Sequence, residues 1–141
     1  MSEIHYLAYI SRTTENLFHS DLKKILTQAQ QNNGRLDVTG LLLYKNRYFI
    51  QALEGDQRIV VALFEKISQD RRHTDVIKIL ERTQAFRLFS NWAMAFRNLD
   101  DTETQNLQGF SQLINQYVEK APADTNPAHI QKILSYFSTL K

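Results

Sequence analysis

Apolar and polar positions in the first hundred residues repeat with two periods, which predict strands and helices in turn. Runs with the character of strands lie at residues 4–11, 38–44, 47–54, 76–82 and 92–96. Apolar positions three to four residues apart predict one helix from Ser20 or Asp21 to just before Gly34, and another from Asp56 to near residues 70–73. The order β-α-β-β-α-β-β, with right-handed crossovers, predicts an α+β ferredoxin-like sandwich, a five-stranded sheet with two helices on one face.

The last third of the chain has a different pattern, which predicts a pair of helices. Apolar residues repeat with the helical period from Leu107 to Val118 and again from Ile130 to Phe137. Between them the segment APADTNP (121–127) breaks one helix and starts the next. We therefore predict a first domain at residues 1–98, followed at residues 99–141 by a helical hairpin that serves packing or oligomerisation.

The composition limits what the protein can do. Of the 141 residues 43% are hydrophobic and 23% charged, and the formal net charge is +2. This charge is too weak to indicate nucleic acid or an anionic membrane as a partner. Apolar runs fall short of the roughly 20 residues of a membrane span, and the N-terminus lacks the features of a signal peptide. The absence of cysteine excludes disulfides, thiolate metal ligands and a cysteine nucleophile, and it favours a cytoplasmic location.

Several polar or oxidisable side chains fall where the pattern predicts a hydrophobic core. They are Tyr9 in the first strand, Gln51 in the third, Asn32 and Asn33 at the end of the first helix, and Trp92 and Met94 in the last strand. Each has an ordinary structural explanation, such as a locally bonded hydroxyl, an edge-strand amide, a helix end or core packing. Together they predict a small-ligand pocket with apolar walls and a short polar edge. Ile25 and Ile67, one from each helix, are placed to clamp a flat ring.

Five segments of the sequence resemble a known family. They are LAYIS (7–11), NNGRLDVTG (32–40), FIQALEG (49–55), DRRH (70–73) and WAM (92–94). In this order and combination they resemble the BLUF family, whose domains sense blue light using flavin, over about residues 3–97. The two-helix tail makes the chain resemble the short, stand-alone members of that family.

The resemblance implies a noncovalently bound flavin, which is FAD with FMN or riboflavin as substitutes. Tyr9, Gln51 and Asn33 match residues that bond to one another and to the N5 and C4=O edge of the flavin ring. The other matching positions are Ile25 and Ile67 on the two faces of the ring, Asn32 and Phe49 beside it, and Lys66, Arg72 and His73 towards the ribityl and phosphate end, where cations suit anionic oxygens. Ala29 stands where relatives often carry a serine, so we expect weaker polar contact there with flavin binding retained.

The resemblance also implies a photoreceptor and not an enzyme. Light would drive electron and proton transfer from Tyr9 to the flavin, and the Gln51 amide would then exchange its donor and acceptor ends by rotation or tautomerisation. Met94 and Trp92 would relay the change through the last strand to a separate signalling protein, with the receptor a homo-oligomer. For Trp92, packing alone, movement into or out of the pocket, and competing electron donation are the alternatives.

Other functions share the predicted architecture, because a fold does not determine an activity. A small acylphosphatase-like enzyme would need an anion-binding loop with an arginine and an asparagine, and the sequence shows no such Gly-rich loop. A nucleic-acid-binding ferredoxin-like module would need the aromatic pattern of RNA-recognition domains, which is also missing. A ligand-free structural domain is the third alternative.

Overall fold

The computed structural model describes most of the α+β domain and a few residues of the tail. The described residues are 3–13, 19–45, 47–70, 73–89 and 94–98, with Ala128, Gln131, Lys132 and Leu134; of residues 19–22, 45, 73 and 95–98 only the backbone is described. The elements are β1 (Ile4–Thr13), α1 (His19–Leu36), β2 (Thr39–Lys45), β3 (Tyr48–Gly55), α2 (Gln57–Ser68), β4 (His73–Gln84) and β5 (Ala95–Asn98). This is the predicted order of strands and helices.

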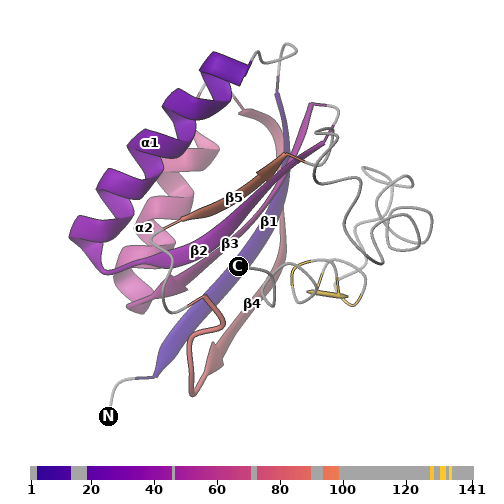
Figure 1. Ribbon diagram of the computed structural model, residues 1–141. Helices are drawn as coiled ribbons and strands as arrows, with labels where there is room; N and C mark the ends of the chain where they lie inside the picture. The colour runs from indigo at the N-terminus through magenta and orange to yellow at the C-terminus, as the bar shows by residue number, and fades with distance from the viewer. Residues whose placement is uncertain are drawn as a thin grey trace.

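One sheet forms the centre of the domain, and both helices cover the same face of it (Figure 1). The strand order is β4-β1-β3-β2-β5. The first four strands are antiparallel to their neighbours, whereas the short β5 pairs in parallel with β2. The predicted α+β ferredoxin-like class is confirmed, but the antiparallel sheet has four strands and β5 only extends its edge.

Helix α1 continues past the glycine that was expected to end it. The prediction of a stop at Gly34 is wrong, since α1 runs to Leu36 and Asp37 is the residue that takes a left-handed conformation, with φ 56°. The backbone N–H groups of Asp37 and Val38 donate to the carbonyls of Gly34 (3.5 Å) and Asn33 (2.9 Å). This pairing closes a helix C-terminus around a left-handed residue. Aspartate tolerates that conformation better than most residues, so it replaces glycine as the terminator.

The last strand begins later than the sequence pattern predicts. β5 covers Ala95–Asn98 instead of residues 92–96, so Met94 precedes the strand, and Trp92 lies outside the described residues. Met94 is nevertheless 2% exposed. Its apolar character therefore reflects packing in the core and not strand pairing, and a pattern of apolar residues alone does not separate the two.

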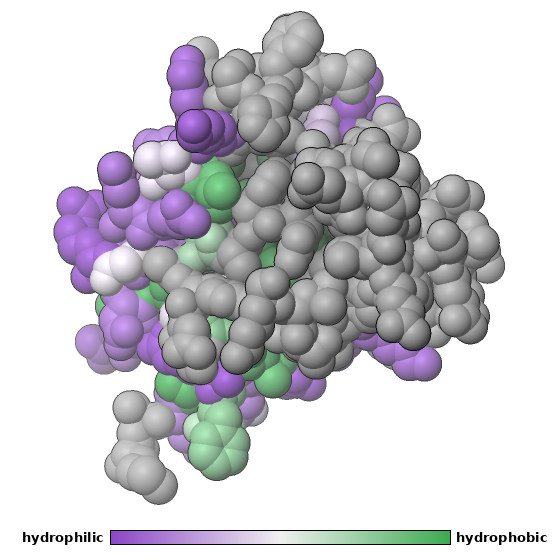
Figure 2. Space-filling model, in the orientation of Figure 1, coloured by the Kyte–Doolittle hydropathy of each residue, from purple (hydrophilic) through white to green (hydrophobic). Residues whose placement is uncertain are grey.

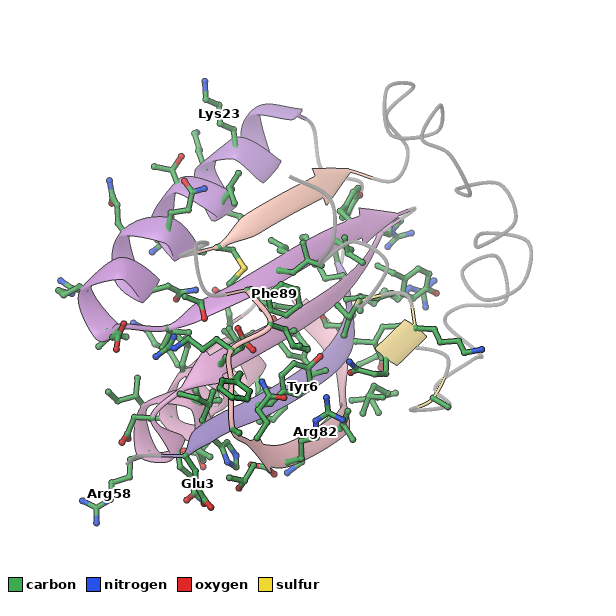
Figure 3. The ribbon with its side chains drawn as sticks, turned by 60° about the horizontal axis from the view of Figure 1, so that its bottom comes forward. Glu3, Tyr6, Lys23, Arg58, Arg82 and Phe89 are labelled. Carbon is green, nitrogen blue, oxygen red and sulfur yellow. The ribbon has the colours of Figure 1, made fainter. Side chains whose placement is uncertain are left out.

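The hydrophobic core lies between the sheet and the two helices. Its buried members are Leu7, Tyr9, Val38, Leu42, Tyr44, Phe49, Leu53, Val60 and Met94. The inner faces of the helices complete it with Ile25, Leu26, Ala29, Leu36, Ile59, Leu63, Phe64 and Ile67. Hydrophilic side chains gather on the side of the molecule formed by α1 (Figure 2), and Lys23 points from α1 away from the sheet (Figure 3). The helices are therefore amphipathic, as predicted.

The sheet face away from the helices is buried as well. Tyr6 is fully buried on this face, and Arg82 lies 5.0 Å from the centre of its ring (Figure 3). The Tyr6 hydroxyl donates to Gln131 Oε1 at 3.0 Å, and Leu134 is fully buried. Gln131 of the tail thus lies against the second face. The boundary at residue 98 and the role of the tail stay predictions.

A buried carboxylate on this second face holds the connector that follows β4. Glu54 is fully buried and accepts hydrogen bonds from Thr39 Oγ1 (3.0 Å) and Gln84 Nε2 (2.9 Å). It also accepts bonds from the backbone N–H groups of Leu88 (2.6 Å) and Phe89 (2.8 Å). Four donors satisfy the carboxylate, which is the condition for burying it. The start of the connector to β5 is thereby tied to β3.

Candidate functional site

A cavity opens between α1, α2 and the sheet, whose relative positions Figure 1 shows. Together with the open solvent at its mouth, it measures about 730 Å³. It is lined from α1 by Ile25, Gln28, Ala29, Asn32 and Asn33, from the strands by Tyr9, Leu42, Phe49, Gln51 and Leu53, and from α2 and its end by Leu63, Lys66, Ile67 and Asp70. The predicted pocket between helices and sheet is therefore present.

Most residues that the sequence placed in one site line this cavity together. They are Tyr9, Ile25, Ala29, Asn32, Asn33, Phe49, Gln51, Lys66 and Ile67. Arg72 lies outside the described residues, and of His73 only the backbone is described, where it pairs with Thr13 at the start of β4. The predicted role of these two residues near a phosphate stays a prediction.

Tyr9 and Gln51 form the polar centre of the site. They are direct partners across β1 and β3, and the Tyr9 hydroxyl donates a hydrogen bond to Gln51 Oε1. Tyr9 is 1% exposed and Gln51 5% exposed, so the bond is made away from water, where an unpaired amide or phenol would be costly. The apolar strand tolerates a glutamine because its neighbour supplies this partner.

The other end of the same amide contacts Met94. Gln51 Nε2 donates to the sulfur of Met94 at 3.5 Å, and both side chains are buried. A thioether is a weak acceptor, so this contact is the easier of the two to give up. Gly40 leaves room for it, because a Cβ at position 40 would stand 3.2 Å from Met94 Cε and would also collide with the backbone oxygen of Ala52. Met94 thus belongs to the site although it does not line the cavity.

The Tyr9 phenol is held in its protonated form. Burial raises the pKa of Tyr9, and the nearby negative charge of Asp70 raises it further. The ring of Phe64 lies against the tyrosine, with a centroid separation of 5.3 Å and a tilt of 55°. A phenol in this environment resists loss of its proton, and its hydroxyl hydrogen lies on the bond to Gln51 Oε1.

The end of α1 supplies further amides to the cavity. Asn33 is 2% exposed, and its backbone carbonyl takes part in the closure of the helix. Asn32 is partly exposed and its Oδ1 accepts a hydrogen bond from Arg35 Nη2 at 3.1 Å. The C-terminus of α1 at Leu36 keeps both residues within the helix, so their side chains are carried on a regular scaffold next to the sheet.

Five lining residues were missed by sequence reasoning: Gln28, Leu42, Leu53, Leu63 and Asp70. The periodic pattern of apolar residues could have predicted most of them. Leu63 precedes Ile67 by one helical turn, and Leu53 follows Gln51 on the same strand face. Asp70 stands four residues after Lys66 and brings a negative charge to a site for which the sequence suggested only positive charges. Its effect on Tyr9 could not be foreseen without the fold.

The lining fits a flat aromatic ligand with a polar edge. Ile25 and Ile67 come from different helices and offer apolar contact, while Tyr9 and Gln51 offer hydrogen-bonding groups from the sheet. Burial of apolar surface contributes roughly 25 cal/mol per Å², so a large ring can be held without a covalent bond. The residues present therefore fit a flavin ring.

Comparison with known proteins identifies the family. The model of the BLUF family, described as sensors of blue-light using FAD, matches residues 4–95, and this chain therefore belongs to the BLUF family. BLUF domains bind flavin and sense blue light. The family assignment does not favour the acylphosphatase-like or nucleic-acid-binding alternatives.

Individual relatives agree with this assignment. The chain is 31% identical to photoactivated adenylate cyclase subunit beta of Euglena gracilis in a match that covers 90% of this chain and 16% of that protein. It is 44% identical to photoactivated adenylate cyclase subunit beta of Euglena longa over 78 residues, which cover 55% of this chain and 9% of that protein. The chain thus spans less than a fifth of the length of these curated relatives.

Solved structures include similar proteins of comparable length. BlrB, a BLUF protein in its dark state, is 26% identical with a TM-score of 0.71, and the match covers 96% of this chain and 98% of BlrB. The ground state of BlsA has a TM-score of 0.81 over 98% of this chain and 89% of BlsA; at 24% identity it supports the fold alone. Within the described residues, no helix combines the length and the apolar character that crossing a bilayer requires.

Proposed function

We propose that the protein is a photosensory signalling protein, and not an enzyme, in which Tyr9 and Gln51 convert the absorption of blue light into a displacement of Met94. The observation that carries the proposal is the continuous chain of contacts from the Tyr9 hydroxyl through the Gln51 amide to the Met94 sulfur, at the polar edge of a cavity that suits a flat ring. The proposed cofactor is FAD, with FMN or riboflavin as substitutes. When bound, it would supply the light absorption and an excited state that accepts an electron.

Different residues of the cavity would contact different parts of this cofactor. Ile25 and Ile67 would contact the two faces of the ring, Asn33 would bond to its polar edge, and Asn32 would lie beside it. The cationic Lys66 would face the ribityl and phosphate end, with Arg72 and His73 as proposed helpers. Asp70 lines the same cavity, and its carboxylate would accept a hydrogen bond from a hydroxyl of the ribityl chain.

Tyr9 is the proposed electron donor. Its proton already lies on a hydrogen bond to Gln51 Oε1, so the proton can move along that bond as the electron leaves the phenol. The environment that raises the pKa of Tyr9 disfavours a phenolate in the dark. The dark state is therefore the neutral phenol bonded to the amide oxygen, and only light supplies the driving force for the coupled loss.

Gln51 is the proposed switch. Its amide has a donor end and an acceptor end, which require opposite partners. In the dark arrangement the acceptor end faces Tyr9 and the donor end faces Met94. Rotation or tautomerisation of the amide would exchange these two ends, so the Met94 sulfur would lose its hydrogen-bond donor.

The proposed output runs through β5. Met94 is followed at once by this edge strand, whose four residues pair with Leu41–Tyr44 of β2. Release of Met94 would loosen the adjoining end of β5 and so reach the surface of the domain. Trp92, two residues before Met94, would move with it, entering or leaving the pocket. The receiving partner is proposed to be a separate signalling protein bound by a homo-oligomer of the receptor.

The absorption spectrum of the purified protein tests the proposed function. We expect a yellow protein whose flavin bands shift reversibly to longer wavelength under blue light. A purified protein that binds no flavin, or binds it without any reversible shift, would contradict the proposal. The mass measured by light scattering in darkness and under illumination tests the oligomer, and a monomer in both conditions would contradict that part alone.

A further inference from the structure

Two glutamine side chains from different layers hold Met94. From the sheet, Gln51 Nε2 donates to the Met94 sulfur at 3.5 Å. From the helix layer, Gln30 Nε2 donates to the backbone carbonyl of Met94 at 3.1 Å. The second bond has the length of an ordinary N–H···O hydrogen bond, and a carbonyl oxygen is a much better acceptor than a thioether. Of these two polar contacts, the contact from Gln30 is therefore the stronger.

Gln30 makes this contact without belonging to the cavity. Its neighbour Ala29 lines the cavity, as do Asn32 and Asn33, but Gln30 does not. Its side chain crosses from α1 to the residue that precedes β5. A change at Gln30 therefore acts on Met94 and leaves the residues that face the ligand in place.

The connector between β4 and β5 is tied down near both of its ends. Glu54 fixes Leu88 and Phe89 to β3 through their backbone N–H groups. At the other end, Gln30 and Gln51 hold Met94. Of these three anchors, only Gln51 carries the group proposed to respond to light. Once Gln51 has turned its donor away, the bond from Gln30 governs how far the end of the connector can move.

We propose that Gln30 is a positioning residue of the light switch, which keeps Met94 against Gln51 in the dark and limits its release in the light. The inference rests on the proposed function, because it assigns Gln30 a part in the same switch. Gln30 acts on the backbone, so its effect does not depend on the side chain at position 94. Its loss should leave flavin binding unchanged and loosen the junction between Met94 and β5.

A matched pair of substitutions on α1 separates this role from general effects on the helix. Gln30→Glu keeps the shape of the side chain but replaces the donor with a carboxylate that repels the Met94 carbonyl. Gln31→Glu makes the same change one residue along, and both positions are exposed. Hydrogen exchange of the backbone amides of β5 and α1 is measured on the flavin-loaded proteins in darkness and under blue light. The rate at which the light-induced spectral shift decays in darkness is recorded for the same samples.

In the dark, the β5 backbone amides of Gln30→Glu are expected to exchange roughly 2- to 10-fold faster than those of Gln31→Glu, because one hydrogen bond is lost. The amides of α1 should exchange alike in both variants, and both should keep the reversible shift. Under blue light the β5 amides of Gln30→Glu should also exchange faster than those of Gln31→Glu, because nothing then limits the release of Met94, and the decay of the shift should slow. Equal β5 exchange and equal decay in the two variants, with a normal spectral shift, would overturn the role of Gln30 alone. A wild-type protein without any shift would overturn the photoreceptor function itself.

Discussion

The hydroxyl of Tyr9 donates a hydrogen bond to the side-chain carbonyl of Gln51, its direct partner across β1 and β3. Both side chains are buried, so neither has water as a substitute partner. This relationship explains why an amide interrupts the apolar strand around residue 51. It also defines the path along which a proton can leave the phenol.

Removal of the Tyr9 hydroxyl tests that path. Tyr9→Phe should fold and bind flavin but show no productive, reversible photochemistry, because the proposed donor loses both its proton and its ease of oxidation. It should also be less stable by about 1–3 kcal/mol, since the buried Gln51 oxygen is left without its partner. Tyr44→Phe, in the same core but outside the cavity lining, is the control. Absorption under repeated illumination and urea denaturation report the two effects, and reversible cycling in Tyr9→Phe would refute the donor role.

The Met94 sulfur can be removed with little change in volume. Met94→Leu should cost less than about 1.5 kcal/mol, keep the flavin shift and reduce the light-induced change in hydrogen exchange of β5. Met94→Ala should also bind flavin and shift, but it should weaken the output more and destabilise the fold by about 2–5 kcal/mol, since the side chain is 2% exposed. If light changed β5 exchange in Met94→Leu and Met94→Ala as much as in wild type, the relay through Met94 would be wrong.

The anchor at Glu54 can be tested through stability. Glu54→Gln replaces one carboxylate oxygen with an NH₂ group. This donor would face other donors, namely the groups that hydrogen-bond to the carboxylate in the wild type. The variant should lose about 1–3 kcal/mol of unfolding free energy, measured by urea denaturation. Glu65→Gln, at an exposed position of α2, should change stability little. A Glu54→Gln protein as stable as this control would show that the connector is not fixed by the carboxylate.

The pH dependence of stability should include a contribution from Glu81. Hydrogen bonds from Lys78 Nζ (2.8 Å) and from the His5 ring (2.6 Å) hold the pKa of the Glu81 carboxyl below its usual range. The folded state therefore favours the ionised carboxylate, so this contribution is present above the ordinary pKa and disappears as the pH falls through the lowered value. Urea midpoints measured from about pH 7 to pH 3 should fall more steeply for wild type than for Glu81→Gln. Parallel curves would refute this assignment.

The periodic patterns predicted the layers of the fold because they depend on which face of each element is buried. Ile25 and Ile67 lie on opposite helices facing one cavity, as their spacing indicated. Ends of elements were predicted less well. α1 ends where Asp37 takes a left-handed conformation and the backbone N–H groups of residues 37 and 38 donate to carbonyls of the last helical turn. Gly34, three residues earlier, gave a stronger local signal for a helix end, but a misleading one.

The site was predictable where residue chemistry was unusual for its surroundings. Tyr9, Gln51 and Asn33 are polar groups in apolar segments, and the structure places all three in one cavity lining. Gln30 and Asp70 gave no such signal, because glutamine and aspartate are ordinary on a helix surface or at a helix end. The hydrogen bond from Gln30 to Met94 and the electrostatic effect of Asp70 on Tyr9 arise only from the packing of α1 and α2 against the sheet.

The most direct measurement is the light-minus-dark absorption spectrum of Gln51→Leu beside wild type. Gln31→Leu, the same change on an exposed position of α1, is the control. Wild type and the control should both show a reversible shift of the flavin bands to longer wavelength. Gln51→Leu should be equally yellow and show no shift, because leucine has neither the hydrogen-bond donor nor the acceptor of the amide. A shift that survives in Gln51→Leu would contradict the central claim that this side chain is the switch.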